Sequence, residues 1–474
     1  MSEVKLEDIV SLCKRRGFIY QGSEVYGGLA GTWDYGPLGV QLKKNIMDLW
    51  WQMFVDTRDD VLGVDAAILM NQQVWQASGH TETFTDPLVE CSNCNARFRA
   101  DKLDDPNKCP NCGETNTFGE PRQFNMMFET KYGPLAHERQ LVFTKQFLQE
   151  ALDNLDDDDE FKHRLVDEVH RSKSLIGDNT IYLRPETAQG IFTNFRNVVD
   201  SFYPDVPFGL AQQGKAFRNE ISPRDFIFRC RELEQMEIEY FVHPDNWEEA
   251  FEMWVKLVHD WCDALGLPKE KVHELEVPES DRAHYSKRTI DFEYDFPIGR
   301  EELSGLAYRT DFDLKNIEKG SGKSMEYRPK DGSAPFVPHV IEPSFGVERA
   351  VMAVLSAAYW EDTANERIVL KLPMHLAPIK VAVLPLAKNK PELVKKAREV
   401  YDLLKKEFGS GVAWVDTGNI GKNYKKMDEI GVMYCVTVDY ETLEGDTKDT
   451  VTVRHRDTTA QDRVKIDELL TNLQ

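Results

Sequence analysis

The chain has 474 residues, of which 41% are hydrophobic and 29% are charged, and this composition is typical of globular proteins. No apolar run approaches the length of a membrane span, and the N-terminus lacks the basic and apolar regions of a signal peptide, so we expect a cytosolic protein without membrane contact. The formal net charge of -23 argues against a nonspecific nucleic-acid binder, because phosphate contacts supply most of that affinity. Any contact with RNA should therefore be local and depend on shape.

The N-terminal part predicts a short helix, an irregular segment, a long helix and a strand. Residues 1–20 contain the short helix, and residues 23–39 are too rich in glycine for regular structure and too aromatic for a linker. A phosphate-binding loop is the alternative for this segment, although no G-x-G-x-x-G motif follows a strand here. Apolar residues at helical spacing follow, and residues 61–69 favour a strand. The apolar stripe of the long helix, which suits either a core or a subunit interface, contains Leu42, Ile46, Leu49, Trp50, Met53 and Phe54.

Two Cys-x-x-Cys pairs indicate a metal site. Cys91 and Cys94 form the first pair, and Cys109 and Cys112 form the second, with a turn sequence inside each. Four thiolates on two turns suit a tetrahedral zinc ion, and a site with four protein ligands is structural. Unliganded thiols are the alternative, and disulfides are disfavoured in a cytosolic chain. The remaining cysteines lack ligand spacing and are expected to be buried; they are Cys13, Cys230, Cys262 and Cys435.

The segment between these pairs and the middle of the chain contains an acidic insertion. Residues 145–180 carry the run 156–160, which consists of aspartates and one glutamate and is expected to be a solvated helix end or loop. Residues 181–190 then predict an extended stretch before Pro185, followed by a helix with Glu186 in its first turn. On composition alone, Glu186 is equally well explained as a carboxylate that stabilises the helix start.

A long antiparallel hairpin is predicted for residues 208–242. Two runs of alternating apolar residues, 208–217 and 232–242, flank a loop marked by Ser222-Pro223-Arg224-Asp225. Arginines and carboxylates occur together along it, which suits a zwitterionic ligand or a triphosphate. An exposed hairpin with surface ion pairs is the alternative.

Further helices and strands follow the hairpin. Residues 245–267 form an amphipathic helix, and residues 282–296 and 301–313 are strand-like. Residues 338–355 predict a strand, a tight turn and an apolar helix. Gly346 and Arg349 fall at that turn, where backbone N–H groups and a cation can meet a phosphate or a base.

The C-terminal residues 374–474 alternate strands and amphipathic helices and predict a separate compact α/β unit. Lys422, Lys425 and Lys426, with Tyr424 between them, form the predicted RNA-facing patch.

Several motifs together resemble a known family. They are Ser23–Gly39, Arg184–Gly190, Phe217–Arg224 and Glu342–Arg349, and they occur in the family's order. On these motifs the chain resembles the class II aminoacyl-tRNA synthetases over nearly its whole length. Within that class it is most similar to the homodimeric glycyl-tRNA synthetases.

The resemblance implies an α+β fold, with an antiparallel sheet and flanking helices. The catalytic domain would span residues 1–373, with a zinc-knuckle-like insertion at 88–120 and the acidic helical insertion at 145–180. The α/β domain at 374–474 would bind the anticodon. The implied activity is the ATP-dependent activation of glycine and its transfer to the 3′ end of glycine tRNA by a homodimer. The implied cofactors are Mg²⁺ and structural Zn²⁺.

The resemblance also implies roles for individual residues. Arg218, Glu220 and Arg349 would act in catalysis, and Glu302 would bind Mg²⁺. The residues implied to bind ATP are Arg218, Asn219, Glu220, Phe228, Arg229, Cys230, Arg231, Glu232, Leu233, Glu302, Leu303, Gly346, Val347, Glu348 and Arg349. Those implied to bind glycine are Arg99, Glu186, Leu233, Glu234, Gln235, Met236, Glu237, Glu342, Pro343, Ser344, Phe345 and Gly346.

One position departs from the family pattern: Leu233 stands where the family usually has a phenylalanine against the adenine. The loss of that ring is expected to weaken stacking by ~1 kcal/mol. Two other functions are alternatives. A non-catalytic accessory subunit would have lost the motif arginines, whereas Arg218 and Arg349 are present here. A synthetase for another small amino acid would lack the acids that match the glycine pocket.

Overall fold

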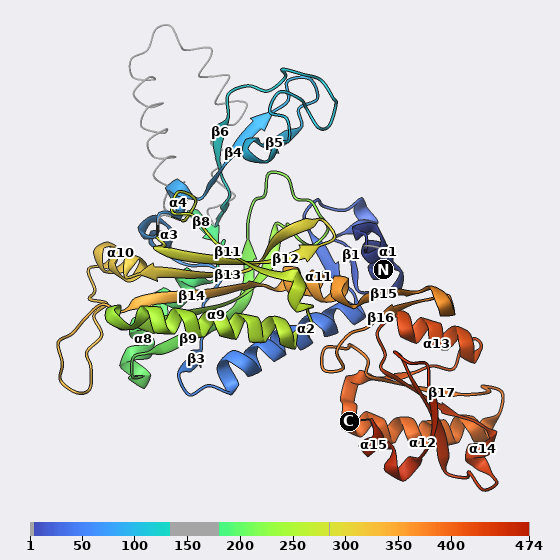
Figure 1. Cartoon of the computed structure of the whole chain (residues 1–474). Helices are drawn as coiled ribbons and strands as arrows, with labels where there is room; N and C mark the ends of the chain where they lie inside the picture. The colour runs from blue at the N-terminus through green and yellow to red at the C-terminus, as the bar shows by residue number, and fades with distance from the viewer. Residues whose placement is uncertain (1–3, 133–179, 284, 474) are drawn as a thin grey trace, which may run out of the picture.

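The computed structural model describes residues 4–132, 180–283 and 285–473, so all but the last residue of the predicted acidic insertion lies outside the described residues. The centre of the molecule is a seven-stranded sheet with the order β11-β12-β13-β14-β10-β9-β3 (Figure 1). Its pairs are antiparallel except for the parallel pair of β3 and β9. The strands are β3 (Val61–Gly63), β9 (Phe208–Phe217), β10 (Glu232–Val242), β11 (Val272–Glu276), β12 (Arg288–Phe296), β13 (Gly299–Thr310) and β14 (His339–Gly346).

The predicted hairpin is confirmed as β9 and β10, which pair from Phe208 opposite Phe241 to Phe217 opposite Glu232. Successive side chains of a strand point to opposite faces. On β10, Met236, Ile238 and Tyr240 enter the main hydrophobic core, so the even-numbered residues face the back of the sheet. The odd-numbered residues face the front, where the polar side chains gather.

Three helices cover the back face: α2 (Pro37–Trp51), α9 (Trp247–Ala264) and α11 (Val347–Ala358). The α2 stripe of the sequence analysis ends in a π-helical turn over Gln52–Asp56 and brings Trp50 and Phe54 against Phe345 of the sheet. Both side chains are fully buried, so this stripe builds the chain's own core. Burial of each large side chain contributes roughly 1.5–3 kcal/mol.

Four helices and a hairpin cover the front face in the described part of the chain. They are α3 (Gln72–Ala77), α4 (His80–Thr83), α8 (Ala188–Phe202), α10 (Phe312–Ser321) and the hairpin of β7 (Phe128–Lys131) with β8 (Thr180–Leu183). The helix predicted to begin near Glu186 begins at Ala188, with Thr187 as its N-cap, so the prediction that Glu186 lies in the first turn was wrong. Because Glu186 lies before the helix, its carboxylate is directed by the chain that leads into α8.

A three-stranded sheet carries the paired cysteines and stands above the main sheet in Figure 1. Its strands are β4 (Thr85–Glu90), β5 (Arg97–Arg99) and β6 (Arg122–Asn125). The predicted insertion at 88–120 therefore starts within β4. Two hydrogen bonds connect this unit to the hairpin loop. The Ser222 hydroxyl donates to the carbonyl of Arg97 at 3.1 Å, and the N–H of Asn219 donates to the carbonyl of Met126 at 2.7 Å.

The N-terminal segment packs under the hairpin loop. It contains α1 (Leu6–Arg16) and a short hairpin of β1 (Ile19–Gln21) with β2 (Trp33–Tyr35). Gly39, in the first turns of α2, lies so close to this hairpin that an added Cβ would meet the carbonyl oxygen of Phe18 at 1.8 Å. Only glycine permits this approach, and this explains part of the glycine content of the predicted irregular segment.

The C-terminal unit is a five-stranded sheet with the order β18-β17-β19-β20-β21 (lower right in Figure 1). Its strands are β17 (Val381–Pro385), β18 (Val412–Trp414), β19 (Tyr434–Val438), β20 (Thr450–His455) and β21 (Gln461–Lys465). Its helices are α12 (Pro391–Phe408), α13 (Ile420–Glu429), α14 (Tyr440–Leu443) and α15 (Leu469–Asn472). A linking hairpin of β15 (Tyr359–Asp362) and β16 (Arg367–Leu370) precedes it and contacts α13.

Tyr424 is half-buried, unlike the exposed lysines of α13. Its hydroxyl is 2.7 Å from the Thr437 hydroxyl and its ring lies under Arg454, and its contact with RNA stays a prediction. Lys422 and Lys426 are exposed, as predicted. Among the described residues, no helix is both long and apolar enough to cross a membrane.

A buried ion-pair network fixes α13 to the linking hairpin. Asp428 is fully buried and accepts from Arg367 at 2.8 Å and from Arg454 at 2.8 and 2.9 Å. We expect Asp428→Ala to lower the free energy of unfolding by about 3–5 kcal/mol, because the buried Arg454 guanidinium loses its counter-charge and Arg367 keeps only Asp362.

Denaturant unfolding of the whole chain measures this effect. Asp402→Ala, at an exposed position of α12, is the control and should leave the unfolding midpoint unchanged. An equal midpoint for Asp428→Ala would show that the network does not stabilise this junction.

Candidate nucleotide and amino-acid site

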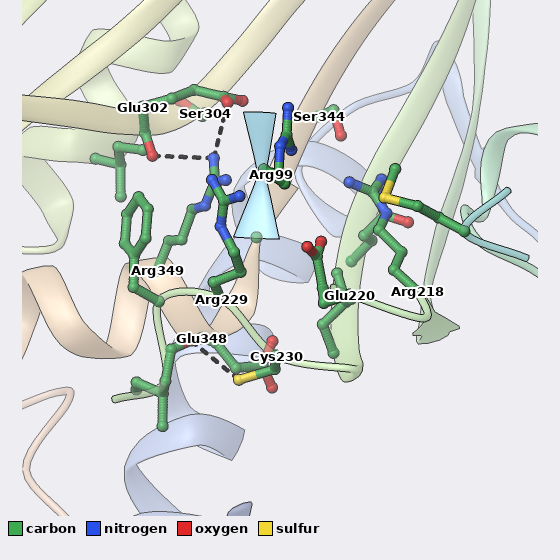
Figure 2. A pocket seen from close by; sticks show the side chains of 17 residues that line it. Arg99, Arg218, Glu220, Arg229, Cys230, Glu302, Ser304, Ser344, Glu348 and Arg349 are labelled. Carbon is green, nitrogen blue, oxygen red and sulfur yellow. Dashed lines mark hydrogen bonds and ion pairs between the residues drawn. The ribbon is translucent and has the colours of Figure 1, made fainter. Parts of the chain in front are cut away.

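A cavity of about 280 Å³ opens on the front of the sheet, between β10, β13, β14 and the loop that joins β9 to β10 (Figure 2). Basic and acidic side chains face each other across it. The lining residues are Arg99, Met126, Arg218, Glu220, Ile227, Phe228, Arg229, Cys230, Leu233, Gln235, Glu302, Leu303, Ser304, Ser344, Gly346, Glu348 and Arg349. The cavity thus collects segments that are far apart in the sequence, and its size and polarity suit a small charged ligand.

Arg349 is held at one side of the cavity. It donates to the Glu302 carboxylate at 2.9 Å and to the Glu302 carbonyl at 3.0 Å (Figure 2). Its guanidinium lies over the Phe228 ring at 4.7 Å from the ring centroid. The positive charge of Arg349 holds the pKa of Glu302 below its ordinary value, so this carboxylate remains available to a cation.

Arg218 and Glu220 occupy the opposite side. Arg218 donates to the carbonyl of Pro185 at 3.1 Å and lies over the Phe84 ring. Glu220 is 8% exposed, and within the described chain its Oε2 atom has no hydrogen-bond partner. Burial raises the pKa of Glu220. An unpartnered acceptor facing a cavity is suited to a ligand that brings its own N–H donor.

Some residues implied to bind ATP have side chains that do not line the cavity. Arg231 donates to the carbonyls of Ala30 and Glu220, each at 3.0 Å, and so ties the loop to the N-terminal segment. Glu232 pairs with Lys215 at 3.0 Å, and Val347 is buried in the core. None of these three side chains, nor that of Asn219, lines the cavity formed by the described residues.

An acidic cluster lies next to the cavity. The Glu237 carboxylate accepts from the hydroxyls of Thr187 at 2.5 Å and Ser344 at 2.8 Å. Glu186 lies 3.3 Å from His80, and Glu342 accepts from Arg309 at 2.8 Å. Ser344 lines the cavity as well, so its hydroxyl connects the two regions.

The acids of this cluster differ in their protonation. Burial alone would raise the pKa of Glu186, but the His80 imidazole, helped by Arg309 and Arg218, lowers it to about 2. Burial and the neighbouring Glu237 and Glu186 raise the pKa of Glu342 to about 8, although Arg309 opposes this. Burial also raises the pKa of Glu237. The cluster therefore contains one firmly ionised acid beside groups that resist ionisation.

Strand alternation divides the residues implied to bind glycine. Leu233, Gln235 and Glu237 face the front on β10, and their partners on β14 include Gly346 and Ser344. The other face of the sheet receives Glu234, which pairs with Lys43 of α2, together with Met236, Pro343 and Phe345. The structure therefore does not bring these four side chains to the pocket.

Arg99 enters the cavity from β5, on the sheet that carries the cysteines. It pairs with Asp86 at 2.8 Å and with Asp101 at 2.7 Å. Burial is the main influence on Asp86 and raises its pKa. The position of Arg99 in the cavity therefore depends on the sheet that carries the cysteines.

Four further polar residues were missed by the sequence analysis: His80, Glu239, Asp291 and Arg309. The alternation that places Glu237 on the front also places Glu239 there, so this signal was present in the sequence. Asp291 and Glu302 converge on Gly305, whose added Cβ would lie 4.0 and 3.8 Å from their oxygens. Nothing in the sequence near His80 or Arg309 identified these two residues, because tertiary packing alone brings them to the cluster.

The cysteine pairs come together as the sequence predicted. The Sγ atoms of Cys91 and Cys112 are 3.7 Å apart, as are those of Cys94 and Cys109, and all the thiols are free. Bonds of ~2.3 Å from a tetrahedral zinc ion require a separation of about 3.8 Å between sulfurs. The donor set therefore fits zinc. The remaining cysteines, Cys13, Cys230, Cys262 and Cys435, are buried, which confirms that expectation.

Comparison with known proteins agrees with this geometry. The model of the class II tRNA synthetase core domain (G, H, P, S and T) matches residues 174–358, and the anticodon binding domain matches residues 380–474. A glycine–tRNA ligase of Deinococcus radiodurans is 44% identical over 99% of this chain and 98% of its own length. The chain belongs to the glycine–tRNA ligase family. The glycine–tRNA ligase of Streptomyces coelicolor is 42% identical over 99% of this chain and 98% of its own length. That of Borrelia hermsii is 43% identical over 98% of this chain and 96% of its own length.

Membership in this family confirms the class II core and the C-terminal anticodon-binding domain that the resemblance implied. The two matched regions lie within the domains predicted at 1–373 and 374–474. Those domain limits and the individual ligand roles stay predictions.

Proposed function

We propose that this chain is a glycine–tRNA ligase that activates glycine with ATP and transfers the glycyl group to the 3′ end of glycine tRNA. The observation that carries this proposal is the position of Ser344, which joins an arginine-lined cavity to an acidic cluster. The cavity suits a nucleotide and the cluster suits an ammonium group. A carboxylate bound between them would lie near the α-phosphate.

Positioning and charge stabilisation account for most of the first step. The glycine carboxylate attacks the α-phosphorus of ATP in line, glycyl-adenylate forms and pyrophosphate leaves. Arg218 would hold the α-phosphate and the incoming carboxylate, and Glu220 would accept from the adenine amine. Arg349 would cover the base from the other side. No general base is required, because the attacking carboxylate is already ionised.

The acidic cluster would select glycine. Glu237 and Glu186 would bind its ammonium group, with Ser344 beside them. Thr187 and Ser344 already donate to Glu237, which fixes its carboxylate in place. Larger amino acids would be excluded by steric crowding at the α-carbon. The energetic cost of this crowding can exceed the roughly 1–3 kcal/mol of discrimination that one methylene provides.

Metal ions would serve two separate purposes. Mg²⁺ would be held by Glu302, with Asp291 beside it, and would neutralise the triphosphate oxygens. Zinc would be held by the paired cysteines and would stabilise the sheet that carries Arg99. The two ions differ in their ligands, since carboxylates suit Mg²⁺ and thiolates suit zinc.

The partners of the chain follow from the same proposal. The anticodon-binding domain would contact glycine tRNA, with Lys422, Lys425 and Lys426 near the RNA. Two copies would form the homodimer that the resemblance implies. The exposed apolar side chains Val25 and Tyr26, which are 87% and 92% exposed, are consistent with such a contact. The cytoplasm, where ATP and tRNA occur, would be the location.

The exchange of pyrophosphate into ATP, measured with each amino acid in turn, tests the activity. We expect exchange with glycine and little with alanine or serine. Exchange with none of them would support the accessory-subunit alternative, and exchange with another small amino acid would replace glycine as the substrate.

Arg218→Ala should lower the glycine-dependent exchange rate by about 10²–10³-fold, because a charged donor to the transition state is lost. Arg218→Lys should restore only part of this rate, because lysine lacks the bidentate fork of arginine. The matched control is Arg224→Ala, on the same loop, where the arginine is half-exposed and pairs with Asp225. A rate near that of the control for Arg218→Ala would refute the assigned role.

Purified protein should contain about one zinc ion per chain held by four cysteines. Cys112→Ser should lose the metal and lower the melting temperature, because its binding stabilises the folded insertion. Cys435→Ala, which removes a buried thiol of the C-terminal unit, should retain the full metal content. Metal analysis that finds no zinc with every thiol free would overturn this assignment.

A further inference from the structure

Glu239 is the deepest carboxyl group of the acidic cluster, and the proposed reaction gives it no role. It follows Glu237 on the front face of β10, and the register places it opposite Glu342 on β14. Its side chain is 0% exposed, and within the described part of the chain neither of its carboxyl oxygens has a hydrogen-bond partner. Oxygens of Glu237, Glu239 and Glu342 lie within 4.8 Å of one another.

The charges around Glu239 do not balance if every acid is ionised. The facing groups are Glu237 on its own strand, Glu342 on β14, Arg309 on β13 and Asp313 on α10; Leu210 faces it from β9. The one cation in this set, Arg309, is already shared by Glu342 and Asp313, which accept from it at 2.8–2.9 Å. Glu186, the next acid, lies against His80.

An ionised Glu239 would therefore be an uncompensated buried charge beside two other carboxylates. Such a charge is expensive in a low-dielectric interior, and neighbouring carboxyl groups respond by retaining a proton. In agreement, burial and the neighbouring Glu342 raise the pKa of Glu239 well above its ordinary value. The pKa of Glu342 is raised to about 8.

We propose that Glu237, Glu239 and Glu342 share a bound proton while the pocket is empty, and that the ammonium group of glycine displaces this proton into solvent. The inference rests on the proposed activation of glycine. The ammonium group takes the place of the proton, so the net charge of the occupied site equals that of the protonated, empty site. The exchange is balanced: the protonated cluster and zwitterionic glycine give the complex and a free proton. The proton belongs to the cluster as a whole.

Glu239 acts in this exchange as a positioning residue, because it lies behind Glu237. Glu237 and Glu342 alone have Arg309 as a cation. The additional carboxyl group of Glu239 has no cation of its own, so the empty cluster binds one more proton. A ligand that carries an ammonium group supplies the missing positive charge. A carboxylate without an ammonium group, such as glycolate, does not.

Calorimetric titration of the full-length protein with glycine at about pH 7.5, in two buffers of different ionisation enthalpy, measures the protons released. We expect roughly one proton or a large fraction of one per glycine bound. Release should decline from about pH 7 to about pH 9, because the empty cluster, in which the pKa of Glu342 is raised to about 8, already loses its proton as the pH rises. Glycolate should release none.

Glu239→Gln separates this role from a merely structural one. The amide keeps the shape of the side chain but cannot ionise, so glycine should still bind while proton release falls by at least about half. Glu274→Gln makes the same chemical change on the edge strand β11 and should behave as the wild type. An unfolding midpoint near that of the wild type confirms that the Glu239→Gln variant is folded.

The outcomes distinguish the two proposals. If glycine binds to the wild type without releasing protons, the inference is wrong and the proposed function stands. If Glu239→Gln releases as many protons as the wild type, Glu239 has no part in the exchange. If glycine does not bind at all, the proposed function fails, and the inference fails with it. If Glu239→Gln does not fold, the pH dependence of proton release by the wild type tests the inference, and release that does not decline as the pH rises would contradict it.

Discussion

The buried guanidinium of Arg309 makes the acidic front of this sheet possible. It is 1% exposed, holds Asp313 with two hydrogen bonds and Glu342 with a third, and lies 3.8 Å from the centroid of the Tyr285 ring. Without this cation, Glu342 would repel both Glu237 and Asp313 at a buried site. Breaking such a network leaves uncompensated charge, at a cost of several kcal/mol. Arg309 therefore permits a cluster in which carboxylates outnumber cations, which is the charge balance that the proposed binding of an ammonium group requires.

The extent to which the sequence predicted the site follows from strand geometry. The β9–β10 hairpin, the β14–α11 turn and the cysteine pairs were predicted because each depends on residues close in sequence. The resemblance assigned whole segments to the ligands, but alternation sends every second side chain away from them. Glu237 and Ser344 therefore face the front of the sheet while Glu234 and Phe345 face α2.

What could not be predicted depends on packing between distant segments. His80 reaches Glu186 because α4 lies against the front face, and Arg309 reaches Glu342 across neighbouring strands. Tyr424 shows the same limit in the C-terminal unit. Its position in the sequence lies between lysines, whereas in the fold it is half-buried and its hydroxyl contacts the Thr437 hydroxyl of β19. Charge and periodicity indicate that a face is polar or apolar, but they do not identify the side chain on a distant strand that it meets.

The departure at Leu233 can be explained from the same geometry. Leu233 faces the cavity from β10, so a base bound there would meet an aliphatic side chain instead of a ring. Phe228, on the loop before β10, lies with its ring against the Arg349 guanidinium and is itself held edge-to-face by Phe296. A ring fixed in this way keeps an aromatic surface beside the cation at little entropic cost, since both partners are already ordered. Phe228 therefore presents an ordered aromatic ring to the cavity from the loop, where Leu233 presents an aliphatic side chain from the strand.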